Sequence, residues 1–155
     1  MSGDGAAARG GRFNPRGMPA LYLALTVEGM LMEIAHGFAH RFDPLTICAY
    51  DVDVDDLIDL RTEADRTEAG VALEDLACPW FLDLSSGRRP ASWALTEVLL
   101  GRGASGILVP SFARGARPGT DNLVLWRWDS RLPHKVRVYD PSGRLPRSPL
   151  SWGGG

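Results

Sequence analysis

The sequence predicts an α+β fold in a single domain spanning residues 1–155. With 155 residues, 45% hydrophobic and 23% charged, the chain suits one hydrophobic core and leaves little room for a second. Short strand-like runs cluster after Gly106, with no helix-like segment between them. A doubly wound parallel sheet needs strands and helices that alternate, so we expect the helices and the sheet to occupy separate parts of the chain.

The first third of the chain predicts one strand followed by one long helix. Residues 20–25 are short, apolar and preceded by a Pro/Gly turn, as is typical of a buried strand. Thr26 is a suitable N-cap for a helix that extends to His40. Apolar residues at helical spacing indicate one buried face, made of Val27, Met30, Leu31, Ile34, Ala35 and Phe38. Residues 1–9, rich in glycine and alanine, are expected to be irregular.

The middle third is expected to be a strand at residues 44–54, a turn and short extension at 55–60, and a weak helix at 61–77. The aromatic cluster at 78–81 is expected to pack in the core or in a pocket wall. Pro90 is well placed at the start of a second clear helix, which Gly101 and Gly103 close.

The last third predicts strands at residues 104–110, 123–128 and 135–139. A glycine-rich loop with two arginines, at residues 112–120, separates the first two of these strands. Residues 140–155 are rich in proline, glycine and serine and are expected to be irregular.

Charge and cysteine usage exclude several classes of function. The formal net charge is −2, which argues against a general nucleic-acid-binding surface. Only Cys48 and Cys78 are present, and no apolar segment precedes Arg12, so we expect a cytoplasmic protein with reduced thiols and no membrane contact.

Three chemically capable side chains lie close together near the N-terminus. Arg12 can bind phosphate or carboxylate with two parallel hydrogen bonds, or it can be a surface arginine. Tyr22 can be a core residue or a stacking platform for a flat heterocycle. Glu33, off the apolar face of its helix, can be a solvated residue or a carboxylate that stabilises a developing cation. Taken one by one, the structural alternative is favoured for each.

A metal site is also conceivable, but the pattern for it is incomplete. Glu33, His36 and His40 share one helical face and could bind zinc or iron. Gly37 stands where a zinc-protease motif carries glutamate, so we expect no metal. Ser111, at the end of a predicted strand, could donate a hydrogen bond to a ligand, and no Gly-x-Ser-x-Gly elbow surrounds it.

Two separated blocks of sequence resemble the RES-domain family, named after its arginine, glutamate and serine. The first is GGRFNPRG at residues 10–17 with PALYLA at 19–24 and then Glu33. The second is GILVPS at residues 106–111, followed by NLVL at 122–125. The order of both blocks agrees with the family, so the resemblance is more specific than any single motif in the chain.

The resemblance implies an ADP-ribosyltransferase-like fold and the toxin of a bacterial type II toxin–antitoxin system. Such proteins consume NAD, either by transferring ADP-ribose to a protein or by NAD hydrolysis or phosphorolysis. Catalytic roles would fall to Arg12, Tyr22 and Glu33. Arg12 would contact the phosphates or ribose of NAD, Tyr22 would stack on nicotinamide, and Glu33 would stabilise the ribose cation. Ser111 and Asn14 would join Arg12 and Tyr22 in binding NAD.

The family also implies a partner and leaves the reaction open. The expected partner is an antitoxin, a helix-turn-helix DNA-binding protein that covers the active site. Many family members have a further strand before the first block, which this chain lacks, so we expect an open site that favours transfer of ADP-ribose to a protein acceptor. NAD glycohydrolase and NAD phosphorylase activities are the alternatives, and a non-catalytic binding module is the alternative from another class.

Overall fold

The chain folds into a four-stranded sheet, a separate two-stranded ribbon and six helices within the residues that the computed structural model describes, 2–37 and 47–145. The helices are α1 (Asp4–Arg9), α2 (Val27–Gly37), α3 (Glu63–Ala69), α4 (Leu73–Leu76), α5 (Trp80–Ser85) and α6 (Ala91–Gly101). The strands are β1 (Leu21–Ala24), β2 (Ala49–Val54), β3 (Leu57–Asp59), β4 (Gly106–Pro110), β5 (Asp121–Leu125) and β6 (His134–Tyr139).

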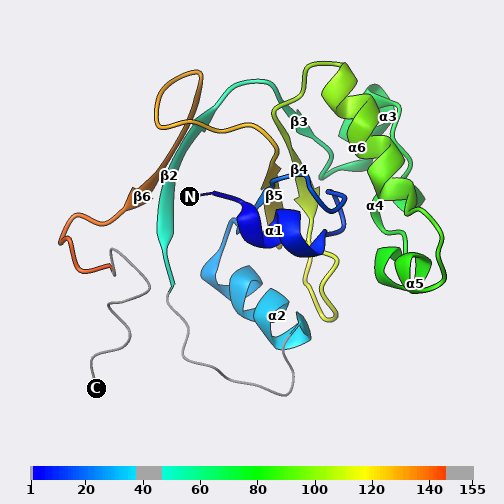
Figure 1. Cartoon of the computed structure of the whole chain (residues 1–155), viewed down its shortest axis with the longest axis horizontal. Helices are drawn as coiled ribbons and strands as arrows, with labels where there is room; N and C mark the ends of the chain where they lie inside the picture. Colours follow the sequence, from blue (N-terminus) through cyan, green and yellow to red (C-terminus); the bar gives the residue numbers. More distant parts are fainter. Residues whose placement is uncertain (1, 38–46, 146–155) are drawn as a thin grey trace.

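The main sheet has the order β1-β5-β4-β3, and β2 pairs with β6 in the ribbon. β1, β5 and β4 are antiparallel neighbours, whereas β3 joins β4 in parallel. Figure 1 shows α3 to α6 grouped on one side of the sheet and the ribbon on the other. Helices and strands are thus segregated, which confirms the predicted α+β class.

The sheet is buried on both faces because its central strands carry the apolar runs 107–109 and 123–125, whose side chains point alternately to the two faces. On one face, Ile107, Val109 and Val124 pack with residues of the helical side such as Leu76 and Leu99. On the other face, Leu123 and Leu125 pack with Val136 and with the inward side chains of the ribbon. The outer face of the ribbon is charged, and Lys135 Nζ lies 3.2 Å from an Asp51 carboxylate oxygen there.

Two segments expected to be irregular are ordered. Residues 4–9 form α1, because three alanines favour a helix and Asp4 and Arg9 have the signs that suit its two ends. Residues 57–59, within the predicted turn, form β3: the turn is confined to Asp56, whose φ is 61°, and the chain then pairs with β4. Residues 140–145 form a turn, whereas 146–155 and the ends of two predicted elements at 38–46 lie outside the described residues.

The aromatic cluster at 78–81 was predicted to be packed, and this is wrong for Phe81. Phe81 is 68% exposed on α5, where its ring contacts Trp80 edge-on at 5.8 Å between centroids. Cys78, in contrast, is buried. The cause is that α5 begins at Trp80 and its first turn faces solvent.

Candidate functional site

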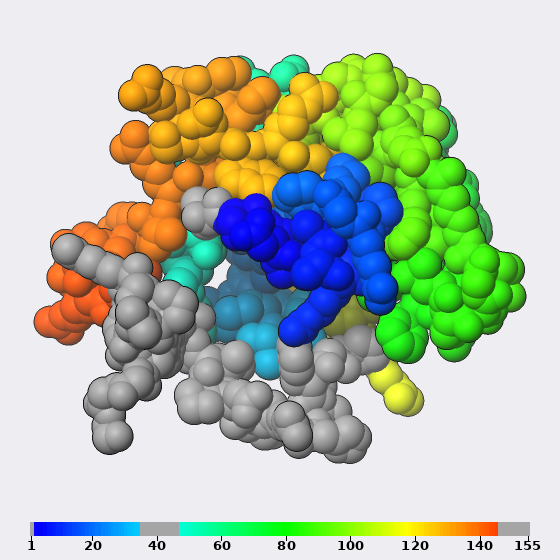
Figure 2. All heavy atoms as spheres, in the orientation of Figure 1, coloured from blue at the N-terminus to red at the C-terminus, as the bar shows by residue number. Residues whose placement is uncertain are grey.

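Arg12 lies in a tight turn of the N-terminal segment, between bridge partners Gly11 and Asn14. Its Nη1 donates hydrogen bonds to the backbone carbonyls of Leu76 (3.1 Å) and Cys78 (2.7 Å). The guanidinium carbon lies 4.8 Å from the centroid of the Phe112 ring, a cation–π distance. Figure 2 shows this N-terminal segment lying across the middle of one face of the molecule, next to the helical side.

The guanidinium of Arg12 is partly desolvated, and burial and the neighbouring side chains shift its pKa in opposite directions. Burial lowers its pKa from the usual value, and the nearby Cys78, Glu33 and Tyr22 oppose this fall. Arginine titrates so far above neutral pH that the side chain stays charged. Within residues 2–37 and 47–145, no partner bonds to its Nε or Nη2, so these donors can meet an anionic ligand.

Tyr22 comes from β1 and is anchored by its hydroxyl. The hydroxyl donates to Asn14 Oδ1 (2.7 Å) and accepts from the backbone N–H of Phe13 (2.9 Å). Burial of this hydroxyl raises its pKa well above the usual value of tyrosine. The residue is nevertheless 42% exposed, which places the exposed area on its ring. A fixed ring with solvent access is suited to stacking.

The Tyr22 hydroxyl predicts a stability effect that depends on pH. In Tyr22→Phe, the Phe13 N–H and Asn14 Oδ1 lose their partner, which we expect to cost about 1–3 kcal/mol near pH 8. The raised pKa means that the folded state keeps the phenol proton where the unfolded chain loses it, so the contribution of this group falls as pH rises above about 10. Urea unfolding of both proteins between pH 8 and 11 should therefore show their stabilities converging, and a constant difference would contradict a buried phenol.

Glu33 is held in place by side chains of the central strands. α2 begins after Thr26, whose hydroxyl accepts from the Gly29 N–H (3.0 Å) as an N-cap. Glu33, two turns further, accepts on Oε1 from the Ser111 hydroxyl (2.6 Å) and from Asn122 Nδ2 (2.7 Å). No described residue bonds to Oε2. The carboxylate is therefore fixed by one oxygen and can present the other to a ligand.

Asn122 was not predicted as a site residue, although its block carried part of the family resemblance. It lies on β5 opposite Ala24 of β1, which directs its side chain toward α2. Its Oδ1 is buried and has no partner among the described residues. A buried carbonyl oxygen without a donor is costly, so a ligand donor would be favourable there. The local signal that could have found it is a polar residue directly before the apolar run 123–125 of the same strand.

Asn14, in contrast, is fully buried and bonds only to protein. Its Nδ2 lies within hydrogen-bond distance of the carbonyls of Ala6, Pro15 and Met18, at 2.9–3.2 Å, and its Oδ1 accepts from Tyr22. A side chain with no exposed area and no spare acceptor is suited to fixing Tyr22. The structure thus brings Arg12, Tyr22, Glu33 and Ser111 to one site and places Asn14 behind it.

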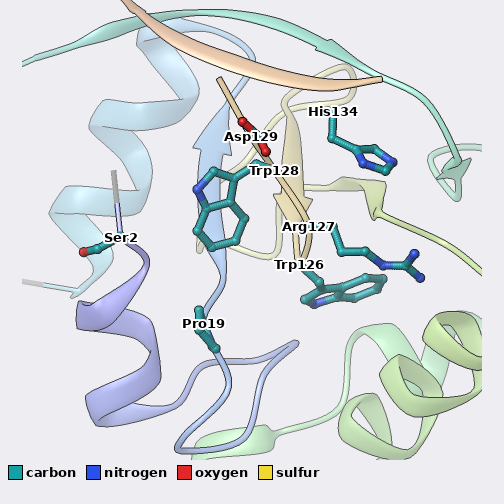
Figure 3. A pocket seen from close by; sticks show the side chains of 7 residues that line it. All are labelled: Ser2, Pro19, Trp126, Arg127, Trp128, Asp129 and His134. Carbon is teal, nitrogen blue, oxygen red and sulfur yellow. The ribbon is translucent and has the colours of Figure 1, made fainter. Parts of the chain in front are cut away.

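Of the predicted site residues, only Tyr22 lines one of the two cavities described below. One of about 660 Å³ is lined by Tyr22 and by apolar residues of β1, α2 and β2, including Met30, Ile34 and Val52. Another, of about 470 Å³, is an open hollow with none of the predicted site residues; Figure 3 shows its lining, which includes Trp126, Trp128 and His134. The bonded groups around Glu33 are therefore a better guide to the site than either hollow.

Within residues 2–37 and 47–145, no group of three His, Cys, Asp or Glu side chains could hold a metal ion. The side chain of His36 and all of His40 lie outside the part of the chain that the structure describes. Both cysteines are unpaired. Over residues 2–37 and 47–145, no helix has the length and apolar character needed to cross a membrane.

Comparison with known proteins shows the family and related proteins of this chain. A family model described as the RES domain matches residues 1–148. The protein named NAD(+) phosphorylase MbcT of Mycobacterium tuberculosis (strain H37Rv) is 29% identical over 140 residues, which cover 77% of this chain and 70% of MbcT; MbcT of Mycobacterium bovis gives the same values. The crystal structure of the M. tuberculosis MbcT–MbcA toxin–antitoxin complex is similar with a TM-score of 0.58 and 25% identity, over 90% of this chain and 74% of that one.

The family match covers residues 1–148 of the 155 residues in the chain. The chain belongs to the RES domain family.

Proposed function

We propose that this protein cleaves the nicotinamide–ribose bond of NAD, with inorganic phosphate as the acceptor, as the toxin of a toxin–antitoxin pair. The observation that carries the proposal is the Glu33 carboxylate, held on one oxygen by Ser111 and Asn122 in the electrostatic range of Arg12. The names of the similar proteins support both the substrate and the acceptor.

The reaction needs charge stabilisation more than covalent help from the protein. When the C–N bond breaks, nicotinamide leaves with the bonding electron pair, and positive charge develops on the ribose carbon. Glu33 would stabilise that charge through its unbonded Oε2. Arg12 would bind a phosphate or ribose of NAD, and the ring of Tyr22 would stack on nicotinamide. A phosphate oxygen then bonds to the ribose carbon, giving ADP-ribose 1″-phosphate.

The acceptor of ADP-ribose that we propose differs from the one expected from the sequence. Transfer of ADP-ribose to a protein acceptor is the expectation from the sequence. The similar proteins are named phosphorylases, which favours inorganic phosphate over a protein. Ser111 and Asn122 would serve by orienting Glu33, and Asn14 by fixing Tyr22.

A product assay tests the proposal and separates its alternatives. The purified protein is incubated with NAD labelled in the adenylate, with and without inorganic phosphate. We expect NAD to disappear in a phosphate-dependent manner, giving ADP-ribose 1″-phosphate and nicotinamide. Free ADP-ribose at the same rate without phosphate would indicate a glycohydrolase, and label on a protein band a transferase. No loss of NAD under any condition would leave a non-catalytic binding module.

We also propose an antitoxin partner for this chain. The similar solved structure is a toxin–antitoxin complex, which supports a partner. A helix-turn-helix protein remains our prediction for its type. Co-expression with a small DNA-binding protein encoded next to this gene should relieve growth inhibition and give a complex that co-purifies; unrelieved inhibition and no complex would argue against that partner.

A further inference from the structure

Three consecutive backbone carbonyls of the Arg12 turn each accept a hydrogen bond from α6. Trp93 Nε1 donates to the Gly11 carbonyl (2.8 Å), and the Ser92 hydroxyl donates to that of Arg12 (2.5 Å). One turn later, the Thr96 hydroxyl lies 3.2 Å from the Phe13 carbonyl. Helix positions i, i+1 and i+4 share one side of a helix, so the start of α6 presents a row of donors to this turn.

This row is unusual because it occupies the buried side of the helix. Ser92 is 0% and Thr96 1% exposed, whereas Val98 on the same helix is 50% exposed. Burying a hydroxyl is unfavourable unless it is hydrogen-bonded, and serine and threonine are poor helix formers. Leu99, the next buried residue of α6, is apolar and packs in the core. The buried polar side chains of α6, Ser92 and Thr96, are therefore placed where the turn accepts hydrogen bonds.

The carbonyl that Ser92 bonds has no second side-chain donor among the described residues, whereas the carbonyl that Thr96 bonds has one. The Phe13 carbonyl also accepts from Trp126 Nε1 (2.9 Å), so it keeps a donor if Thr96 is removed. The Thr96 hydroxyl has the Ser92 carbonyl as a second acceptor, at 2.9 Å. Among the described residues, the Arg12 carbonyl accepts a side-chain bond from Ser92 alone.

Ser92 and Cys78 together connect both ends of Arg12. The Cys78 thiol lies 3.3 Å from the Ser92 hydroxyl, and the Cys78 carbonyl accepts from the Arg12 guanidinium. These contacts form a closed ring, in which the Arg12 backbone contacts Ser92, Ser92 contacts Cys78, and Cys78 contacts the Arg12 side chain. Movement of the backbone of Arg12 would thus disturb the direction of its guanidinium.

We propose that Ser92 is a positioning residue for Arg12, which sets the direction of the free guanidinium donors toward the anionic part of NAD. This rests on the proposed function, in which Arg12 contacts NAD. Ser92 itself is fully buried and does not touch the substrate. Its contribution should therefore appear only while Arg12 is present.

A double-mutant cycle on NAD affinity tests this dependence. All variants carry Glu33→Gln, which slows the consumption of NAD, and the dissociation constant of NAD is measured by calorimetry. Ser92→Ala should weaken NAD binding about 5- to 30-fold, as expected for the loss of one to two hydrogen bonds. In an Arg12→Ala background, Ser92→Ala should have no further effect. Thr96→Val is the matched control and should change the affinity less than Ser92→Ala.

Other outcomes overturn the proposal in distinguishable ways. An equal loss of affinity with and without Arg12 would show that Ser92 has a merely structural role. No loss on Ser92→Ala, while Arg12→Ala weakens binding, would refute the role of Ser92 and leave the proposed function standing. An Arg12→Ala variant that binds NAD like its parent would refute both. If Ser92→Ala does not fold, Ser92→Cys, which keeps a weak donor, should show a smaller loss that again vanishes without Arg12.

Discussion

Glu33→Gln should lower kcat for NAD cleavage about 100- to 1000-fold, the range found when one preorganised electrostatic group is removed from an active site. Glutamine has almost the same shape, and its carbonyl oxygen can still accept from Ser111 and Asn122. What is lost is the negative charge that would face the ribose cation. Because the charge matters most in the transition state, NAD affinity should change far less than kcat.

Glu28→Gln is the matched control for this prediction. Glu28 lies on the same helix, in its first turn, and its carboxylate is exposed and 3.4 Å from the Arg117 guanidinium. Exposed pairs of this kind contribute little, about 0–1 kcal/mol. Turnover should therefore be unchanged, as measured by the release of nicotinamide. A Glu33→Gln protein as active as Glu28→Gln would remove Glu33 from the mechanism.

The main elements of the fold could be predicted because their signals are local, and most residues of the candidate site were proposed from the sequence. The apolar spacing after Thr26 predicts α2, and the Pro/Gly turn before residue 20 predicts β1. The predicted buried face of α2 is wrong for Val27 and Leu31, which are 63% and 53% exposed. Arg12, Tyr22, Glu33 and Ser111 were found through the order of two sequence blocks, since each residue alone suited a structural role. The structure then places Glu33 within hydrogen-bond distance of Ser111, 78 positions away.

The features that were missed depend on partners far along the chain. β3 is only three residues long, and its strand geometry comes from parallel pairing with β4. Ser92 and Thr96 look like exposed helix residues, and only the carbonyls of a segment 80 or more positions earlier explain their burial. Asn122 has the same difficulty, because its partner Glu33 is 89 positions away.

The structure gives a steric reason for the glycine at position 11, directly before Arg12. A Cβ at Gly11 would lie 2.6 Å from the Tyr22 hydroxyl oxygen and 2.7 Å from Asn14 Oδ1. Both of these oxygens are held by other hydrogen bonds, so neither can move away without loss. The glycine therefore makes room for the pair of side chains that supports the site.

Gly11→Ala should in consequence reduce both stability and activity. Overpacking of this kind costs about 1–3 kcal/mol, which for a protein of this size lowers Tm by about 2–12 °C. The ring of Tyr22 would shift with its hydroxyl, and NAD turnover should fall together with stability. Urea unfolding and the nicotinamide-release assay measure the two effects.

Gly101→Ala separates this contact from the general effect of replacing a glycine. Gly101 is the last residue of α6, has no atom within 4 Å of a new Cβ, and does not have a positive φ. Alanine there should stabilise the protein by about 0.5–1 kcal/mol, because it restricts the unfolded chain and favours the helix. If Gly11→Ala lowers the stability and Gly101→Ala raises it, the close approach of Tyr22 and Asn14 requires glycine at position 11. If both variants raise the stability, alanine can replace Gly11, and the anchoring of Tyr22 does not depend on this glycine.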